Sequence, residues 1–233
     1  MKWPTADVLR VRAQLPEGYQ LERFDHAHIP QLIECIKRWH PDISVGANSG
    51  YLREDFYLNR VCLEGELDRD IWVSPISFRG ELVAVFSVER EVDSLALFGR
   101  IIIVAPAHRG ANLAEFAIHA AEIIGRSMGA AFLYAMATLK IPHAQRALEG
   151  AGYRLLGFFP GYDREEVSPG VVKRVYQAVY AKLLVSSEEV LLPDPKNMTP
   201  KTRELFELLF GDAPVASPVA HPACEPAVNS AAT

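Results

Sequence analysis

Apolar and polar positions in the first half of the chain follow the pattern of strands that pair with their neighbours. Three consecutive stretches, 71–78, 81–90 and 95–104, are strand-like, and Arg79-Gly80 forms a tight turn between the first two. We therefore predict an antiparallel meander. Earlier in the chain, residues 19–24 alternate as a half-buried strand does.

Apolar residues at helical spacing predict helices before and after this meander. Asp25 caps the first helix, and residues 51–63 form a second one. The apolar face of the first helix consists of Ile29, Leu32, Ile33, Ile36 and Trp39. The helix after the meander ends near Gly129, and its apolar stripe consists of Leu113, Phe116, Ala117, Ala120 and Ile124.

The second half of the chain predicts three more strands. Strand 131–138 follows the long helix, and a right-handed crossover of this kind places the two strands that it connects parallel to each other. A short helix then begins near Pro142. Residues 153–159 and 171–184 form a closing antiparallel pair, with a loop at 160–170 between them.

The remaining segments lie outside this pattern and suggest how the chain is organised. We expect residues 1–16 to form an N-terminal arm, 17–184 the main domain, and 185–211 a C-terminal extension whose helix starts at Thr199-Pro200. From 212 to 233 the chain is mostly Ala, Pro, Val and Ser without periodicity, so we predict a disordered tail.

The passage from the third meander strand into the long helix carries the most informative local signal. The first turn of a helix exposes backbone N–H groups, and the helix dipole adds partial positive charge there, so a phosphate can bind. Arg109 adds a fixed positive charge, and Gly110, Ala111 and Ala114 keep side-chain bulk away from an approaching ligand. The segment predicts an anion-binding site.

The hexapeptide Arg109-Gly110-Ala111-Asn112-Leu113-Ala114, together with the order of the elements, resembles the GCN5-related N-acetyltransferase (GNAT) superfamily. The phosphate loop of that family has the pattern Arg/Gln-x-x-Gly-x-Gly/Ala. Its first and last positions match here, and Asn112 stands where the family has its middle Gly. The resemblance runs from about residue 17 to about 184. It implies an α/β (α+β) fold with a mixed, mostly antiparallel sheet, splayed central strands and flanking helices.

The resemblance also implies acetyl-CoA, or another acyl-CoA, as co-substrate. In the family the pantetheine arm lies between the splayed strands and the pyrophosphate binds at the start of the following helix. The positions that would contact the arm are Ile102, Ile103 and Val104. Those that would contact the phosphates are His108, Arg109, Gly110, Ala111, Asn112, Leu113 and Ala114.

Acyl transfer to an amine needs a base for the amine proton and an acid for the departing thiolate. The family often uses a strand Glu as base, and Glu89 fits, with Glu91 on the same strand face. The family's acid is a Tyr four residues before the closing Gly152, where this chain has Leu148. The candidate substitutes are His143 and Tyr162.

Arg100 is a further candidate, because it lies in the middle of an otherwise apolar strand. A buried arginine needs a carboxylate partner or a bound anion. We expect the acceptor of the reaction to be a primary amine of a small molecule, and Arg100 could bind a carboxylate group on that acceptor. Two alternatives stay open: an acyl-CoA-binding module of weak catalytic power, and an acyl-homoserine-lactone-type synthase on the same fold.

Composition narrows the possible partners. The 233 residues carry a net charge of −5 with no basic cluster, so nucleic acid is excluded as a partner. No apolar run approaches the length of a membrane span, and Cys35, Cys62 and Cys224 form no metal-like or redox-like pair. We expect a cytoplasmic protein without a metal, a membrane partner or a signal peptide, present as a monomer or a homodimer.

Overall fold

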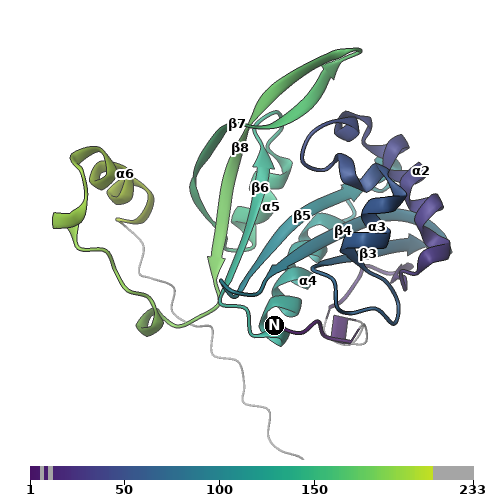
Figure 1. Cartoon of the computed structure of the whole chain (residues 1–233), viewed down its shortest axis with the longest axis horizontal. Coiled ribbons are helices and arrows are strands. Elements are labelled where there is room, and N and C mark those ends of the chain that lie inside the picture. The colour runs from purple at the N-terminus through teal and green to yellow at the C-terminus, as the bar shows by residue number, and fades with distance from the viewer. Residues whose placement is uncertain (6–7, 10–12, 212–233) are drawn as a thin grey trace, which may run out of the picture. The chain divides into compact units, whose positions relative to one another are not determined.

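Eight strands form one sheet in the computed structural model, which describes residues 1–5, 8–9 and 13–211 (Figure 1). In chain order these are β1 (Tyr19–Leu21), β2 (Val61–Cys62), β3 (Ile71–Phe78), β4 (Glu81–Glu91), β5 (Ala96–Val104), β6 (Phe132–Thr138), β7 (Arg154–Ser168) and β8 (Val171–Leu183). Their order across the sheet is β1-β3-β4-β5-β6-β8-β7, with β2 beside β3.

Neighbouring strands are antiparallel except at two places. β5 runs parallel to β6, and the short β2 runs parallel to β3. The parallel pair follows from its connection, because the helix between β5 and β6 returns the chain to the same end of the sheet. The sheet is therefore mixed and mostly antiparallel, which confirms the predicted fold class.

Helices flank the sheet. They are α2 (Ile29–Trp39), α3 (Glu54–Arg60), α4 (Leu113–Met128) and α5 (His143–Gly150), and the C-terminal α6 (Pro200–Phe210) belongs to a separate unit. α4 packs on β4, β5 and β6, while α2 contacts α3 and β5. No helix in the described ranges is long and apolar enough to cross a membrane.

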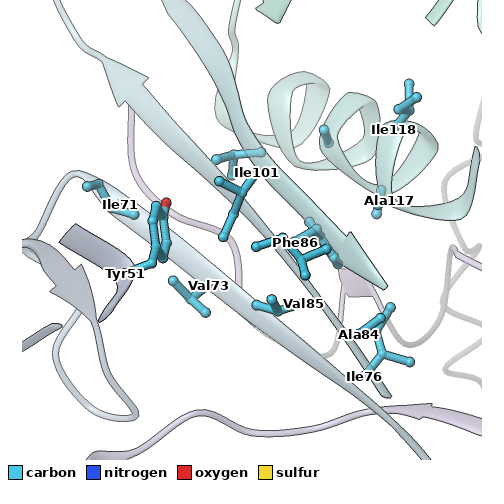
Figure 2. Packing of buried hydrophobic residues seen from close by; sticks show 14 of the residues in the cluster. Tyr51, Ile71, Val73, Ile76, Ala84, Val85, Phe86, Ile101, Ala117 and Ile118 are labelled. Carbon is cyan, nitrogen blue, oxygen red and sulfur yellow. The ribbon is translucent and has the colours of Figure 1, made fainter. Parts of the chain in front are cut away.

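The core lies where the meander meets these helices. Figure 2 shows Phe86 of β4 on the side of the sheet that faces α4, and its ring lies 6.2 Å from that of Phe116 of α4. Phe86 is 1% exposed and Val85 is fully buried. Burying such side chains contributes about 1.5–3 kcal/mol each, so β4 is firmly held in the core.

The chain divides into two compact units, Met1–Leu184 and Val185–Thr233. In the first, Trp3 of the predicted N-terminal arm packs against Trp72 with ring centroids 5.6 Å apart, and its indole N–H donates to the Arg69 carbonyl at 2.7 Å. In the second, the Thr199 side chain caps α6 by accepting from the Thr202 N–H. The predicted disordered tail, 212–233, lies outside the described residues.

The structure corrects two predicted elements. The predicted loop 160–170 is wrong, because β7 continues to Ser168; a register shift between Phe159 and Asp163 absorbs Pro160 and Gly161 as a bulge. The predicted helix 51–63 is also too long, since only Glu54–Arg60 is α-helical and Val61–Cys62 instead pairs with β3. In both places, pairing with a distant strand outweighs the local pattern.

Candidate functional site

β5 and β6 pair over a short distance and then separate. Their ladder runs from Ala96 opposite Phe132 to Gly99 opposite Ala135. Beyond Gly99, β5 continues to Val104 paired with β4 alone, and β6 continues to Thr138 paired with β8 alone. The central strands are thus splayed, as predicted.

A bulge in β5 turns the backbone toward this gap. The register with β4 shifts between Ser87, opposite Ile101, and Val88, opposite Gly99, which leaves Arg100 as the extra residue. Past the bulge the Ala105 N–H donates to the Val83 carbonyl of the β4 side at 2.8 Å. Because backbone direction alternates along a strand, the N–H and C=O groups of Ile102 and Val104 face away from β4, into the gap.

The start of α4 lies at the open end of the gap. A 3-10 turn, Pro106–His108, is followed by Gly110 at φ 86° and Asn112 at φ 57°, and the helix begins at Leu113. Among non-glycine residues, Asn tolerates this left-handed conformation best, which explains how it occupies the family's glycine position. No side chain in the described part of the chain caps the first turn, so its N–H groups are available to an anion.

The positions flanking the helix start divide into buried and exposed ones. Ile103 and Leu113 are 6% and 2% exposed, so their side chains belong to the core and only their backbone can contact a ligand. Arg109 is exposed, whereas the His108 ring is held by the Tyr19 hydroxyl, 2.9 Å from Nδ1. Tyr19 therefore anchors the turn that precedes Arg109.

Comparison with known proteins agrees with this geometry. Neither a protein-family model nor a curated protein sequence matches the chain. Solved structures do, among them RimL, a ribosomal L7/L12 α-N-protein acetyltransferase in complex with coenzyme A, at 13% identity over 73% of this chain and 97% of that one, with a TM-score of 0.57. This chain has the GNAT fold.

Two further GNAT structures match at similar levels. The spermidine/spermine N-acetyltransferase SpeG from Vibrio cholerae is 12% identical over 72% of this chain and 95% of that one, with a TM-score of 0.57. The ribosomal-protein-S5-alanine acetyltransferase from Vibrio fischeri is 10% identical over 73% and 96%, with a TM-score of 0.56. Identities this low describe the shared fold, so the site has to be built from this chain's own residues.

A cluster of opposite charges lies on β4 and β5, beside the bulge at which the gap begins. The carboxylate of Glu89 accepts from Arg60 Nη2 at 3.0 Å and from Arg100 Nη1 at short range. The Arg100 side chain is only 15% exposed, and its Nε has no hydrogen-bond partner among the residues that the structure places. Glu89 thus supplies the carboxylate partner that a buried arginine needs.

Tyr51 closes this cluster from the side of the helices. It is fully buried, and its hydroxyl lies 2.5 Å from the Ser87 Oγ. Burial is the main cause that raises the pKa of Tyr51 to about 12, so the phenol stays neutral. Sequence reasoning missed Tyr51 and Arg60, because Tyr51 meets Arg100 from 49 positions earlier in the chain and Arg60 meets Glu89 from 29 positions earlier.

The predicted catalytic side chains lie on three separate elements. Glu89 is on β4, His143 begins α5 and is exposed, and Tyr162 lies on the β7 bulge at 47% exposure. No hydrogen bond joins any two of them within residues 13–211. Leu148, which takes the place of the family's tyrosine, is 4% exposed and packs in the core.

The tip of the β7–β8 hairpin is tied to the loop between α2 and α3. The Ala47 N–H donates to the Asp163 carboxylate at 2.8 Å, and Ser44 Oγ donates to Glu166 at 3.1 Å. Lys140, which follows β6, bridges Asp42 at 3.1 Å and Glu165 at 2.6 Å. These contacts join three segments around the end of β6.

Proposed function

We propose that this chain transfers an acetyl or similar acyl group from acyl-CoA to a primary amine of a small molecule. The observation that carries the proposal is the separation of β5 from β6 leading directly to the uncapped start of α4 behind Arg109. An extended, amide-rich ligand can bond to the unpaired strand edge while its phosphates bind the helix N-terminus.

The residues on these elements suit the two halves of coenzyme A. Ile102 and Val104 offer N–H and C=O groups to the pantetheine amides, in the manner of an added strand. Arg109, Gly110 and the first turn of α4 offer a fixed charge and free N–H groups to the pyrophosphate. When bound, acyl-CoA would supply the activated thioester, and the chain's residues would orient it.

Binding of the donor can be tested with a charge reversal. Arg109→Glu places a carboxylate beside two phosphates, so we expect acetyl-CoA to stabilise this variant much less than the wild type. A tenfold loss of affinity removes about 1.4 kcal/mol of ligand stabilisation. The measurement is the thermal shift with saturating acetyl-CoA, and Arg38→Glu on α2 is the matched control. An unchanged shift in Arg109→Glu rules out this phosphate site.

Turnover is tested with acetyl-CoA and a panel of primary amines. We expect acetylated products by mass spectrometry and an equal amount of free thiol, measured in parallel. A panel of amines that all stay unmodified, with no thiol released, contradicts the proposed activity.

A second function is favoured by Leu148. With a buried aliphatic residue in the place of the thiolate acid, the chain would bind acyl-CoA without transferring the acyl group. Such a binding module gives the acetyl-CoA thermal shift, loses it in Arg109→Glu, and releases no thiol with any amine. The two assays together separate the candidates.

A further inference from the structure

A pocket lies at the outer edge of β3, away from the gap between β5 and β6, and its volume is about 250 Å³. β1 and β2 both pair with this edge of β3. The ladder of β1 ends at Ile76, and β2 covers only Ile71 and Trp72. The edge of β3 between these two ladders stays uncovered, and the pocket lies there.

Pro75 explains why the ladder between β1 and β3 stops. Its carbonyl accepts from the Glu22 N–H at 3.0 Å, so this position faces the β1 side, but a proline has no N–H to donate in return. The chain then leaves β3, and the Phe24 carbonyl accepts from the Glu64 N–H at 2.9 Å. These two hydrogen bonds and the pairing of β2 with β3 form a frame around the pocket.

The wall of the pocket is mostly apolar. Its apolar lining residues include Leu21, Phe24, Leu63, Trp72 and Val73. A cavity of about 150 Å³ with such a lining binds benzene, so this larger pocket has room for a molecule of about two fused rings. Most of the binding energy would come from removing the apolar surface of such a molecule from water.

The charged side chains around the pocket are already engaged. Arg23 and Glu64 form an ion pair with each other at 2.7 Å, and both side chains are largely exposed. The Glu22 carboxylate accepts from the hydroxyl of Ser77, which does not line the pocket. The three charged side chains carry a net charge of −1, which repels an anion. A cation would lose its hydration without finding an unengaged carboxylate among them.

Ser74 is the polar group that remains available to a ligand. It is 4% exposed, and its Oγ accepts from the Trp72 indole N–H at 2.8 Å. Its own O–H has no acceptor among the residues that the structure describes, although the pocket lies next to it. A buried donor without a partner is unfavourable, so a ligand that offers an acceptor is favoured here.

We propose that this pocket binds a small, uncharged and mostly apolar molecule of about two rings that carries one hydrogen-bond acceptor, such as a carbonyl oxygen. The Ser74 hydroxyl donates to that oxygen, and the apolar wall covers the rest of the molecule. The site is separate from the proposed acyl-CoA site, because β4 and β5 separate β3 from the gap. It therefore does not depend on acyl transfer.

The test uses three molecules of similar shape, 1-indanone, indane and 1-aminoindane, titrated into the full chain by NMR. The first has a carbonyl oxygen, the second has no polar group, and the third carries an ammonium group. We expect 1-indanone to bind about fivefold more tightly than indane and about tenfold more tightly than 1-aminoindane. A wild type that binds neither 1-indanone nor indane overturns the site. Tightest binding of 1-aminoindane overturns the uncharged class of ligand.

A bulky side chain on the exposed side of the pocket tests the location. Leu67 lines the pocket and is 44% exposed, so Leu67→Trp adds volume there without replacing a buried side chain. We expect this variant to bind 1-indanone and indane about tenfold more weakly or worse. Leu58→Trp, at 40% exposure on α3, is the matched control and should bind both molecules as the wild type does. Unchanged binding in Leu67→Trp overturns the location.

The role of the Ser74 hydroxyl is tested together with Trp72→Phe, because an indole N–H that has lost its acceptor could otherwise replace the hydroxyl. In Trp72→Phe alone we expect the preference for 1-indanone over indane to remain. In Trp72→Phe/Ser74→Ala this preference should disappear, while indane binds equally to both variants. A preference that survives loss of the hydroxyl, or one that the wild type never shows, overturns the hydrogen bond to Ser74. If the double variant does not fold, the wild-type preference and Leu67→Trp still decide whether the pocket is the site.

Discussion

Gly46 is the position where one added methyl group tests how the β7–β8 hairpin is held. Its φ is +91°, and a Cβ there would lie 2.3 Å from the Arg164 carbonyl oxygen and 2.3 Å from the Asp163 Oδ1. Both distances are far inside van der Waals contact, which begins at about 3.5 Å. Gly46→Ala must therefore move the hairpin away from the loop and lengthen the hydrogen bond that the Ala47 N–H donates to Asp163.

Backbone strain and displacement of the hairpin together set the loss of stability that we expect for Gly46→Ala. A left-handed alanine costs about 1–2 kcal/mol in backbone strain. Displacing the packed hairpin costs a further amount of about 1–3 kcal/mol, the range of overpacking in a filled site. For a chain of this length, each kcal/mol lowers the melting temperature by about 2–4 °C.

Gly65→Ala isolates the first term. Gly65 has φ +87°, nearly that of Gly46, but a Cβ there has no atom within 4 Å. Thermal unfolding of both variants and the wild type should place Gly65→Ala between the other two. If Gly46→Ala and Gly65→Ala lower the melting temperature by the same amount, the contact with the hairpin does not contribute to stability and the argument fails.

Substitutions at two further positions, Leu148 and Glu122, test the packing and the charges beside α5. Leu148 is 4% exposed, and Leu148→Tyr adds volume there, so we expect thermal unfolding to show a loss of about 1–3 kcal/mol in the free energy of unfolding. The volume-conserving Leu148→Met should lose less than about 1.5 kcal/mol. Equal stability of the tyrosine variant and the wild type would show that the site has room for the family's acid. Burial opposes ionisation of Glu122, but Lys182 and Arg126 outweigh it and lower the pKa of Glu122. The stability that ionised Glu122 contributes is therefore present at pH values above the ordinary carboxyl pKa and is lost as the pH falls through the lowered pKa. Glu122→Gln should have a lower melting temperature than the wild type at neutral pH and the same one in strong acid. A difference that persists in strong acid would contradict this.

Local pattern was sufficient for many elements of this fold. The predicted strand 71–78 coincides with β3, and the apolar stripe that begins at Leu113 is the buried face of α4. The cap Thr199 precedes α6 as its sequence indicates. These features depend on side-chain periodicity and capping within about one turn or one strand, which the sequence displays directly.

The chemistry on the sheet was decided by register, which no local pattern contains. The sequence places Glu89 and Glu91 on one strand face, but only the tertiary structure gives Glu89 two guanidinium groups and Glu91 the hydroxyl of Tyr134, 43 positions away. The bulge at Arg100 shifts the pairing by one residue, so the backbone groups of Ile102 turn into the gap. The sequence alone thus determined most of the elements and the place where α4 begins, behind Arg109. Long-range strand pairing decided which charges meet, because it sets the row and the face on which each side chain lies.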